Sequence, residues 1–247
     1  MALVVNADDF GKDESVNRAI TEAFENRLID RTTLMANMPA ATEAMELARQ
    51  HGFAAKVGLH INLTSGQPLT EKMRNDRVMC DENGRFSGDF ARSFKTRFFL
   101  PKETSSHIEE ELRAQFDMYR QLGGRLWHVD SHHYVHTDPS VWRVLKRVMK
   151  DYPVTSVRLT RNMYSGGNPL MHIYKALFNM SVRRICKNRP EYFGSAADYD
   201  EFTKGRPGLI RDHEVEVMVH PVYDNDGKLC DIFHGVFRDL VSYKRDN

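Results

Sequence analysis

The sequence is poor in cysteine and contains no long apolar run. Its 247 residues include 3 cysteines, and Cys80, Cys186 and Cys230 lie far apart without forming a CxxC pair. A sparse, odd set of cysteines argues against a disulfide framework and favours a reducing compartment. No stretch reaches the roughly 18 consecutive apolar residues of a membrane-spanning helix, and the apolar run before Asp8 is too short for a secretory signal. We therefore expect a cytoplasmic protein.

The sequence also lacks an excess of charge of either sign. Lys and Arg number 35 against 34 for Asp and Glu, which gives a formal net charge of +1. This balance gives no reason to expect nucleic acid or a membrane surface as a partner. Three sequence motifs are absent as well: the glycine-rich phosphate loops GxGxxG and GxxxxGK, and the Gly-x-Ser-x-Gly nucleophile elbow. Their absence disfavours nucleotide-binding folds and serine hydrolases.

Predicted strands and helices alternate along the chain. Apolar or alternating runs predict strands at 2–7, 31–38, 56–63, 126–130, 155–159 and 214–220, the last clear strand. Helical spacing predicts helices at 14–27, 39–51, 104–122, 138–151 and 168–188, with a polar loop excursion at 64–95. Such alternation indicates βαβ units and a mainly parallel sheet. We expect a barrel-like α/β fold with its chemistry at the carboxyl ends of the strands.

Acids and histidines gather where the predicted strands end. These residues are Asp8, Asp9, His60, Asp130, His132, His133, His136 and His220. Because the carboxyl ends of parallel strands share one face, residues far apart in sequence can converge there. The spacing alone leaves open which of them would bind an ion.

The individual signals differ in strength. Asp8-Asp9 could be a helix cap in a turn at Gly11, but two adjacent carboxylates after an apolar strand also suit a bound cation. His60 taken alone is more typical of a structural histidine than of a ligand. His220 either faces solvent or acts as a general acid, because imidazole can carry a proton near neutral pH.

The segment HVDSHHYVH at 128–136 is the strongest local signal. It holds 4 of the 11 histidines of the chain. Imidazoles at this density suit Zn²⁺ or a similar ion, and Asp130 can fix one ring in a single tautomer. The alternative is a histidine-rich surface loop. A strand before the segment and a capped helix after it favour a rigid site instead.

Five segments resemble, in order, the motifs of the YdjC-like carbohydrate deacetylases. They are VVNADDFG at 4–11, TTLMANMP at 32–39, VGLHINLTSGQPL at 57–69, HVDSHHYVH at 128–136 and EVMVHP at 216–221. The resemblance implies one domain over residues 1–247, a distorted (β/α) barrel related to the polysaccharide deacetylases. Segments 70–104 and 162–199 match no family motif, so the resemblance indicates the reaction better than the sugar.

The resemblance also implies a set of roles. It implies a divalent ion, Mg²⁺ or Zn²⁺, held by Asp9, His60 and His132, with Asp8 as the base and His220 as the acid. The implied substrate is a small acetylated carbohydrate, an amino sugar or chitooligosaccharide such as N,N'-diacetylchitobiose, which loses its N-acetyl group. A homodimer is plausible for the family.

Three further residues are predicted to contact the substrate: Asn62, His136 and Arg158. Arg158 resembles a family arginine with this role, although a surface ion pair is an equal alternative. Two other functions stay open: another metal-dependent hydrolase on a similar barrel (a phosphoesterase or an amidohydrolase), and a non-catalytic sugar-binding protein. For Trp127 and the aromatic cluster Phe94, Phe98 and Phe99 we predict core positions over interface positions.

Overall fold

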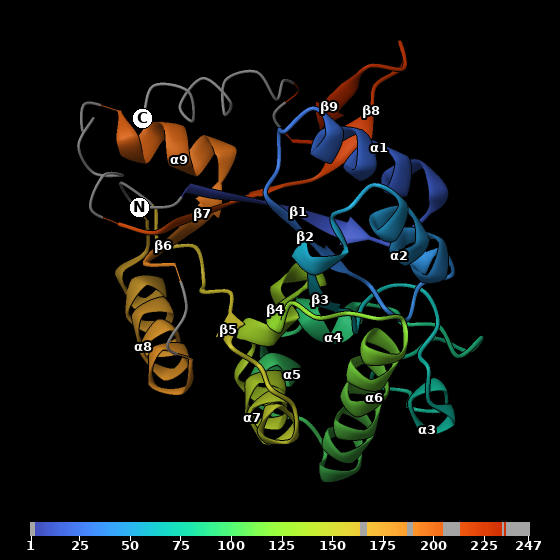
Figure 1. Cartoon of the computed structure of the whole chain (residues 1–247). Helices are drawn as coiled ribbons and strands as arrows, with labels where there is room; N and C mark the ends of the chain where they lie inside the picture. The colour runs from blue at the N-terminus through green and yellow to red at the C-terminus, as the bar shows by residue number, and fades with distance from the viewer. Residues whose placement is uncertain (1–2, 164–166, 187–189, 205–212, 234, 236–247) are drawn as a thin grey trace.

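Seven strands form one parallel sheet that curls into a half-barrel surrounded by helices (Figure 1). The computed structural model describes residues 3–163, 167–186, 190–204, 213–233 and 235. The strands are β1 Leu3–Phe10, β2 Arg31–Leu34, β3 Val57–Ile61, β4 His128–Ser131, β5 Ser156–Val157, β6 Tyr192–Ser195 and β7 Val215–Val219. Their order in the sheet is β5-β4-β3-β2-β1-β7-β6. This architecture confirms the predicted distorted barrel.

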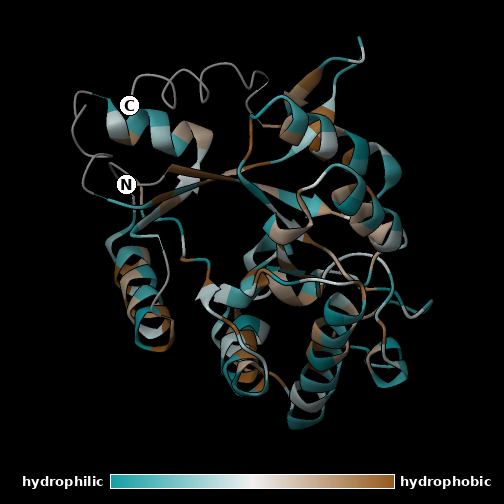
Figure 2. Ribbon diagram, in the orientation of Figure 1, coloured by the Kyte–Doolittle hydropathy of each residue, from teal (hydrophilic) through white to brown (hydrophobic). Residues whose placement is uncertain are grey.

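Helices follow most strands and cover the outside of the sheet (Figure 1). They are α1 Glu14–Glu25, α2 Ala41–Gln50, α3 Glu71–Arg74, α4 Asp89–Arg92, α5 Phe94–Phe98, α6 Lys102–Gln121, α7 Pro139–Val148, α8 Pro169–Ile185 and α9 Ala196–Thr203. Short 3₁₀ turns are η1 Ala54–Lys56, η2 His132–Thr137 and η3 Met149–Asp151. The helices carry both hydrophilic and hydrophobic residues (Figure 2), as expected for elements that bury one side against a sheet.

The sheet is apolar toward the helices and polar toward the barrel interior. In β7, Val215, Val217 and Val219 are buried in the apolar core, whereas the Glu216 carboxylate binds the fully buried Arg158 guanidinium. Because successive side chains of a strand point to opposite faces, alternate residues of one strand serve the core and the interior. The polar interior is where the site is built.

The gap between the two edge strands is bridged by the chain that leaves β5. The Asn162 N–H donates to the Phe193 carbonyl at 3.0 Å, and the Phe193 N–H donates to Asn162 Oδ1 at 2.7 Å. These two hydrogen bonds join the segment after β5 to β6. They connect the two edges of the half-barrel although β5 and β6 are not paired as neighbouring strands.

Several elements were not predicted from the sequence. The expected loop at 64–95 contains α3, α4 and the start of α5, and β6 lies in a segment without a matching motif. A hairpin of β8 Pro221–Tyr223 and β9 Leu229–Asp231 follows β7 and packs beside α1 (Figure 1). Elements of three or four residues carry too little periodicity to be read from a sequence. The predicted ends at Ala2 and at 187–188 lie outside the described residues.

The prediction of core positions for the aromatic residues is partly wrong. Trp127 packs against the core beside Phe116 and Tyr152. In contrast, Phe94 is 77% exposed and Phe99 is 69% exposed, because α5 is a short surface helix whose apolar residues do not all face inward. Within the described part of the chain, none of the helices is both long and apolar enough to cross a bilayer.

Candidate active site

Asp8 and Asp9 line the same cavity because β1 departs from regular strand geometry at its end. The pairing of β1 with β2 shifts register between Ala7 and Phe10, and Asp9 has a left-handed backbone with φ 70. Consecutive residues of a regular strand would point to opposite faces. The irregular turn instead brings both carboxylates into one cavity of about 430 Å³. Gly11 follows with φ +88, and a side chain there would press on Leu34 and Ala41.

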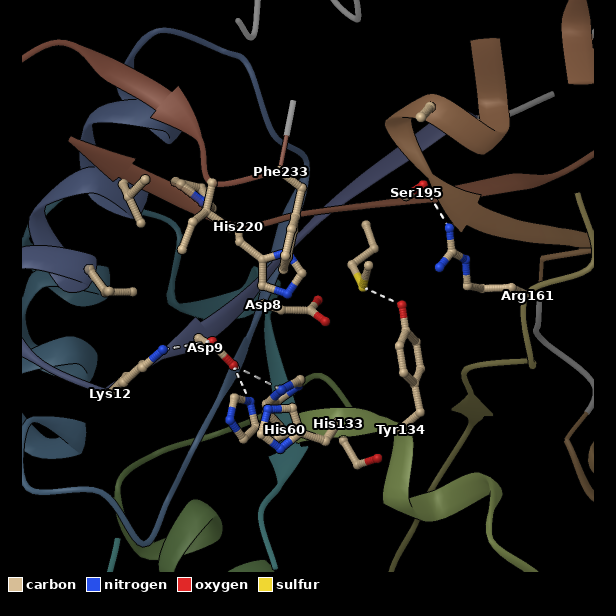
Figure 3. A pocket seen from close by; sticks show the side chains of 18 residues that line it. Asp8, Asp9, Lys12, His60, His133, Tyr134, Arg161, Ser195, His220 and Phe233 are labelled. Atoms are coloured by element: carbon tan, nitrogen blue, oxygen red, sulfur yellow. Dashed lines mark hydrogen bonds and ion pairs between the residues drawn. The ribbon is translucent and has the colours of Figure 1, made fainter. Parts of the chain in front are cut away.

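Asp9, His60 and His132 converge as the resemblance implied. The Oδ1 atom of Asp9 lies 2.8 Å from His132 Nδ1 and 3.2 Å from His60 Nε2. The candidate ligand atoms of the three residues all lie within 4.8 Å of one another. Asp9 and His60 lie near the ends of β1 and β3, and His132 directly follows β4. Figure 3 shows Asp9 and His60 below Asp8. A carboxylate oxygen and two imidazole nitrogens at this spacing form a group that could hold a metal ion.

His60 is fixed in one orientation by a second carboxylate. Its Nδ1 atom lies 2.7 Å from Asp130 Oδ1, and the Thr33 hydroxyl donates to Asp130 Oδ2 at 3.0 Å. Nε2 is therefore the nitrogen left to face Asp9. The predicted contact of Asp130 with a histidine ring is present, at His60. A carboxylate behind a ligating histidine is the usual support of a metal-binding imidazole.

Two other groups of acids and histidines could in principle hold an ion: Asp8-His60-Asp130 and His128-Asp130-Glu216. Both surround the guanidinium of Arg158, which lies 2.6 Å from Asp8, 2.8 Å from Asp130 and 2.7 Å from Glu216. A permanent cation already compensates these carboxylates. The group that faces the cavity is the one around Asp9.

Arg158 is the buried centre of this interior. Its side chain is 0% exposed, and its two terminal nitrogens donate to the two oxygens of Asp8 at 2.6 and 2.7 Å. Burial alone would lower the pKa of Arg158. The surrounding carboxylates raise this pKa by more than burial lowers it, so it lies well above the ordinary value. A second arginine, Arg31, lies 2.6 Å from Glu216. The interior therefore holds compensated charges, as buried charges require.

The two aspartates of the cavity are both held as carboxylates. Burial raises the pKa of Asp8, but the Arg158 guanidinium opposes it and the net pKa lies below the ordinary value. Burial likewise raises the pKa of Asp9, whereas hydrogen bonds from His132 and His60 bring it well below the ordinary value. Burial lowers the pKa of His60, and Asp130 together with Asp9 raises it to about 10. Both aspartates of the cavity are thus carboxylates at neutral pH.

His220 follows β7 and lies on the wall above Asp8 (Figure 3). Its backbone N–H donates to Asp231 Oδ2 at 2.6 Å, and its ring contacts Phe233 edge-on with centroids 5.0 Å apart. Pro221 begins β8 directly after it, so the hairpin that the sequence did not reveal is the element that positions this histidine. The predicted acid and the predicted base line one cavity.

The three residues predicted to contact substrate do not line the cavity. Asn62, His136 and Arg158 are each 0% exposed. The Asn62 amide binds Asn37, the Ser65 carbonyl and two backbone N–H groups of the following turn. His136 lies between the Ser131 hydroxyl at 2.5 Å and the Arg158 carbonyl at 3.1 Å. All three are bonded to protein groups and are absent from the lining of the cavity.

The cavity is also lined by residues that had no assigned role in the sequence, among them Lys12, Tyr134, Arg161 and Phe233. Lys12 Nζ lies 3.3 Å from Asp9 Oδ2, and Arg161 is paired with Asp198 at 2.5 Å. Tyr134 lies within the HVDSHHYVH segment, in which only the histidines and Asp130 were predicted to act. The other three come from loops, where no periodicity marks a side chain as facing a site.

Comparison with known proteins places the chain in a family. Residues 2–247 match the family model described as YdjC-like protein. The chain is 33% identical over 222 residues to a protein named carbohydrate deacetylase from Geobacillus stearothermophilus, covering 89% of this chain and 79% of that protein. It is 35% identical over 229 residues to one of the same name from Brevibacillus brevis, covering 93% and 84%. A Vibrio cholerae protein of that name is 37% identical, but the match spans only 57% of its length.

A solved structure has the same fold. A putative cellobiose-phosphate cleavage protein from Enterococcus faecalis V583 superposes with a TM-score of 0.66 at 25% identity, covering 91% of this chain and 82% of that one. The family model spans all but the first residue, and the Geobacillus and Brevibacillus relatives align over most of their lengths. With the ordered motifs and the strand-end site, these matches lead to one conclusion: the chain belongs to the YdjC-like family.

Proposed function

We propose that this protein is a metal-dependent carbohydrate deacetylase that hydrolyses the N-acetyl group of an amino sugar or a chitooligosaccharide such as N,N'-diacetylchitobiose. Relatives named carbohydrate deacetylase support the reaction class. The observation that carries the proposal is that one cavity unites Asp9, His60 and His132 with a separate carboxylate, Asp8, and a separate imidazole, His220. Ion binding alone would need neither of the last two groups.

The donor set fits one divalent ion, and we favour Zn²⁺ over Mg²⁺. Two imidazole nitrogens and one carboxylate oxygen are a donor set of catalytic zinc sites, whereas Mg²⁺ prefers oxygen ligands. His60 also has the supporting carboxylate, Asp130, that ligating histidines usually have. When bound, the ion would polarise the acetyl carbonyl and make a bound water more acidic.

Asp8 is the proposed base for the attacking water. Arg158 and Asn6 hold its oxygens, with Asn6 Nδ2 donating to Oδ1 at 2.8 Å. The lowered pKa of Asp8 keeps it a carboxylate at neutral pH, so it can accept a proton. His220, on the wall above it, is the proposed acid that gives a proton to the leaving amine nitrogen. In this scheme Arg158 positions Asp8, which replaces the predicted contact with substrate.

The proposal is tested by acetate release from N-acetylated sugars, N,N'-diacetylchitobiose among them. We expect activity in the protein as purified, loss after chelation, and recovery on adding Zn²⁺. Asp8→Asn should lower kcat by about 10³-fold or more, because it removes the proton acceptor while keeping the shape of the side chain.

Metal content separates the two aspartates. Asp9→Asn should lose the ion as well as activity, whereas Asp8→Asn should keep the ion. Full activity in the presence of chelator would contradict the metal mechanism. Two ions per chain together with phosphate-ester hydrolysis would instead favour a phosphoesterase, and sugar binding without turnover of any acetylated sugar would favour a binding protein.

A further inference from the structure

Tyr134 is held in the cavity by an unfavourable backbone. It lies in η2, two residues after His132, and has φ 57 and ψ 23, with His133 similar at φ 53 and ψ 25. A left-handed conformation costs a residue with a Cβ roughly 1 to 2 kcal/mol. Bulky residues rarely adopt it, and strained residues of this kind concentrate at functional sites. The strain aims the phenol along the side of the cavity that faces His220 and Phe233 (Figure 3).

The hydroxyl of Tyr134 has a poor partner for a buried group. It donates to Met218 Sδ at 3.1 Å, and a thioether sulfur is a weak acceptor. In the described part of the chain no N–H or O–H group donates to its oxygen. The hydroxyl is a neutral donor and acceptor with unused bonding capacity beside the proposed base.

The position of the ring decides which part of a ligand it would meet. Tyr134 and Arg161 line both the 430 Å³ cavity and an adjoining cavity of about 170 Å³. Two of the proposed ion ligands, Asp9 and His60, lie beneath Asp8 in the view of Figure 3, whereas Tyr134 stands to one side of it. A group at the junction of the two cavities would meet the sugar ring, away from the acetyl carbon.

We propose that Tyr134 is a specificity-determining residue whose hydroxyl exchanges its bond to Met218 for a hydrogen bond with a hydroxyl of the bound sugar. This inference rests on the proposed function for the identity of the ligand. A purely structural role would not need the oxygen, because the ring already packs against Phe193 with centroids 6.2 Å apart, and phenylalanine would pack as well. A site built to bond a hydroxyl discriminates strongly against analogues that lack it.

The test compares Tyr134→Phe with the wild type on N,N'-diacetylchitobiose and on a set of its monodeoxy analogues. Tyr223→Phe is the matched control, because that hydroxyl donates to Glu22 at 2.8 Å, outside both cavities. We expect Tyr134→Phe to lower kcat/KM by about 10- to 100-fold, mainly through KM. On one deoxy analogue, the one lacking the recognised hydroxyl, wild type and variant should be equal.

A binding measurement makes the inference independent of turnover. In an Asp8→Asn background, calorimetry with the same disaccharide should show about 10-fold weaker binding when Tyr134→Phe is added. A variant equal to the parent in both assays, or an equal loss on every analogue, would overturn the inference. Failure of the wild type to release acetate would instead count against the proposed function, and calorimetry would still decide the role of Tyr134.

Met218→Leu supplies a second check should Tyr134→Phe fold poorly. Since the sugar is proposed to displace the sulfur contact, this variant should keep KM within about twofold. A loss in Met218→Leu as large as that expected for Tyr134→Phe would show that the contact with sulfur matters rather than the contact with sugar, and would overturn the inference.

Discussion

At the scale of single residues, the site depends on how buried charges are compensated. Arg158 touches Asp8, Asp130 and Glu216, which come from β1, β4 and β7. One guanidinium with five donors can satisfy several carboxylates at once, which an ammonium group cannot do with the same geometry. Arg158 thus links the proposed base to the carboxylate that orients His60.

Replacing Arg158 should expose how much the fold depends on it. Arg158→Met keeps the aliphatic stem of the side chain but removes the guanidinium from Asp8, Asp130 and Glu216, of which only Glu216 keeps a second arginine, Arg31. We expect a loss of about 3 to 5 kcal/mol in the free energy of unfolding, measured by urea denaturation. Arg92→Met is the control, because Arg92 and its partner Asp89 are 81% and 73% exposed, and it should leave the midpoint unchanged. Equal midpoints in both variants would contradict the role given to Arg158.

His136 should make the protein sensitive to acid. Burial, with Arg158 nearby, lowers the pKa of His136 from 6.5 to about 3. The unfolded chain therefore binds this proton at a higher pH than the folded one, so stability is complete above about pH 6.5 and falls as pH decreases toward about 3.

The variant His136→Gln removes this titration. We expect the gap in unfolding free energy between wild type and variant to narrow by about 2 kcal/mol between pH 8 and about pH 5. Urea denaturation at both pH values measures it. A gap that stays constant would mean that His136 does not titrate as its burial indicates.

At the scale of elements, strand ends and the turns that leave them aim the side chains. Register makes His60 on β3 the partner of Asp130 on β4, and this pairing places the ligand beside its supporting carboxylate. Close approach of the two strands depends on Gly58, where a Cβ would lie 2.9 Å from the His128 carbonyl and 3.0 Å from Thr33 Cγ2.

Gly58→Ala should therefore disturb the site through the sheet. We expect a loss of about 1 to 3 kcal/mol in the free energy of unfolding, because the added methyl meets backbone that cannot move freely. Weaker Zn²⁺ binding should accompany it, since His60 lies two residues further along β3. The exposed Ala55, changed to Ser, is a control in the preceding turn. An unchanged Zn²⁺ affinity in Gly58→Ala would show that the packing of β3 at Gly58 does not determine the position of His60 as a ligand.

At the scale of the whole molecule, the proposed ion ties together strands that are distant in sequence. Its ligands stand at the ends of β1, β3 and β4. An ion that binds the folded chain and not the unfolded one stabilises the fold by mass action, by about 2.7 kcal/mol at 100 times its dissociation constant. For a chain of this size that corresponds to a rise of about 5 to 10 °C in Tm.

Scanning calorimetry with added Zn²⁺ or with chelator measures this coupling. The wild type and Asp8→Asn should both show the rise, whereas Asp9→Asn should show none. A Tm that ignores Zn²⁺ in the wild type, or a rise that survives in Asp9→Asn, would place the ion elsewhere in the molecule.

The sequence by itself determined the alternation of strands and helices, and with it the parallel barrel, because apolar periodicity is a local property. It also determined that acids and histidines end several strands, so that Asp9, His60 and His132 could meet. Short elements such as β6 and the β8–β9 hairpin were not predicted, because three or four residues are too few to show an apolar periodicity.

Only the tertiary structure decided which of these residues face the cavity. Left-handed backbones at Asp9, His133 and Tyr134 turn neighbouring side chains to one side, and a strict strand pattern does not predict such turns. The burial of Arg158 likewise follows from carboxylates on three strands that pairing brings together. Long-range contacts thus bind Arg158 to three carboxylates of the protein. They also place Tyr134 and Phe233, which the sequence did not single out, in the wall of the cavity.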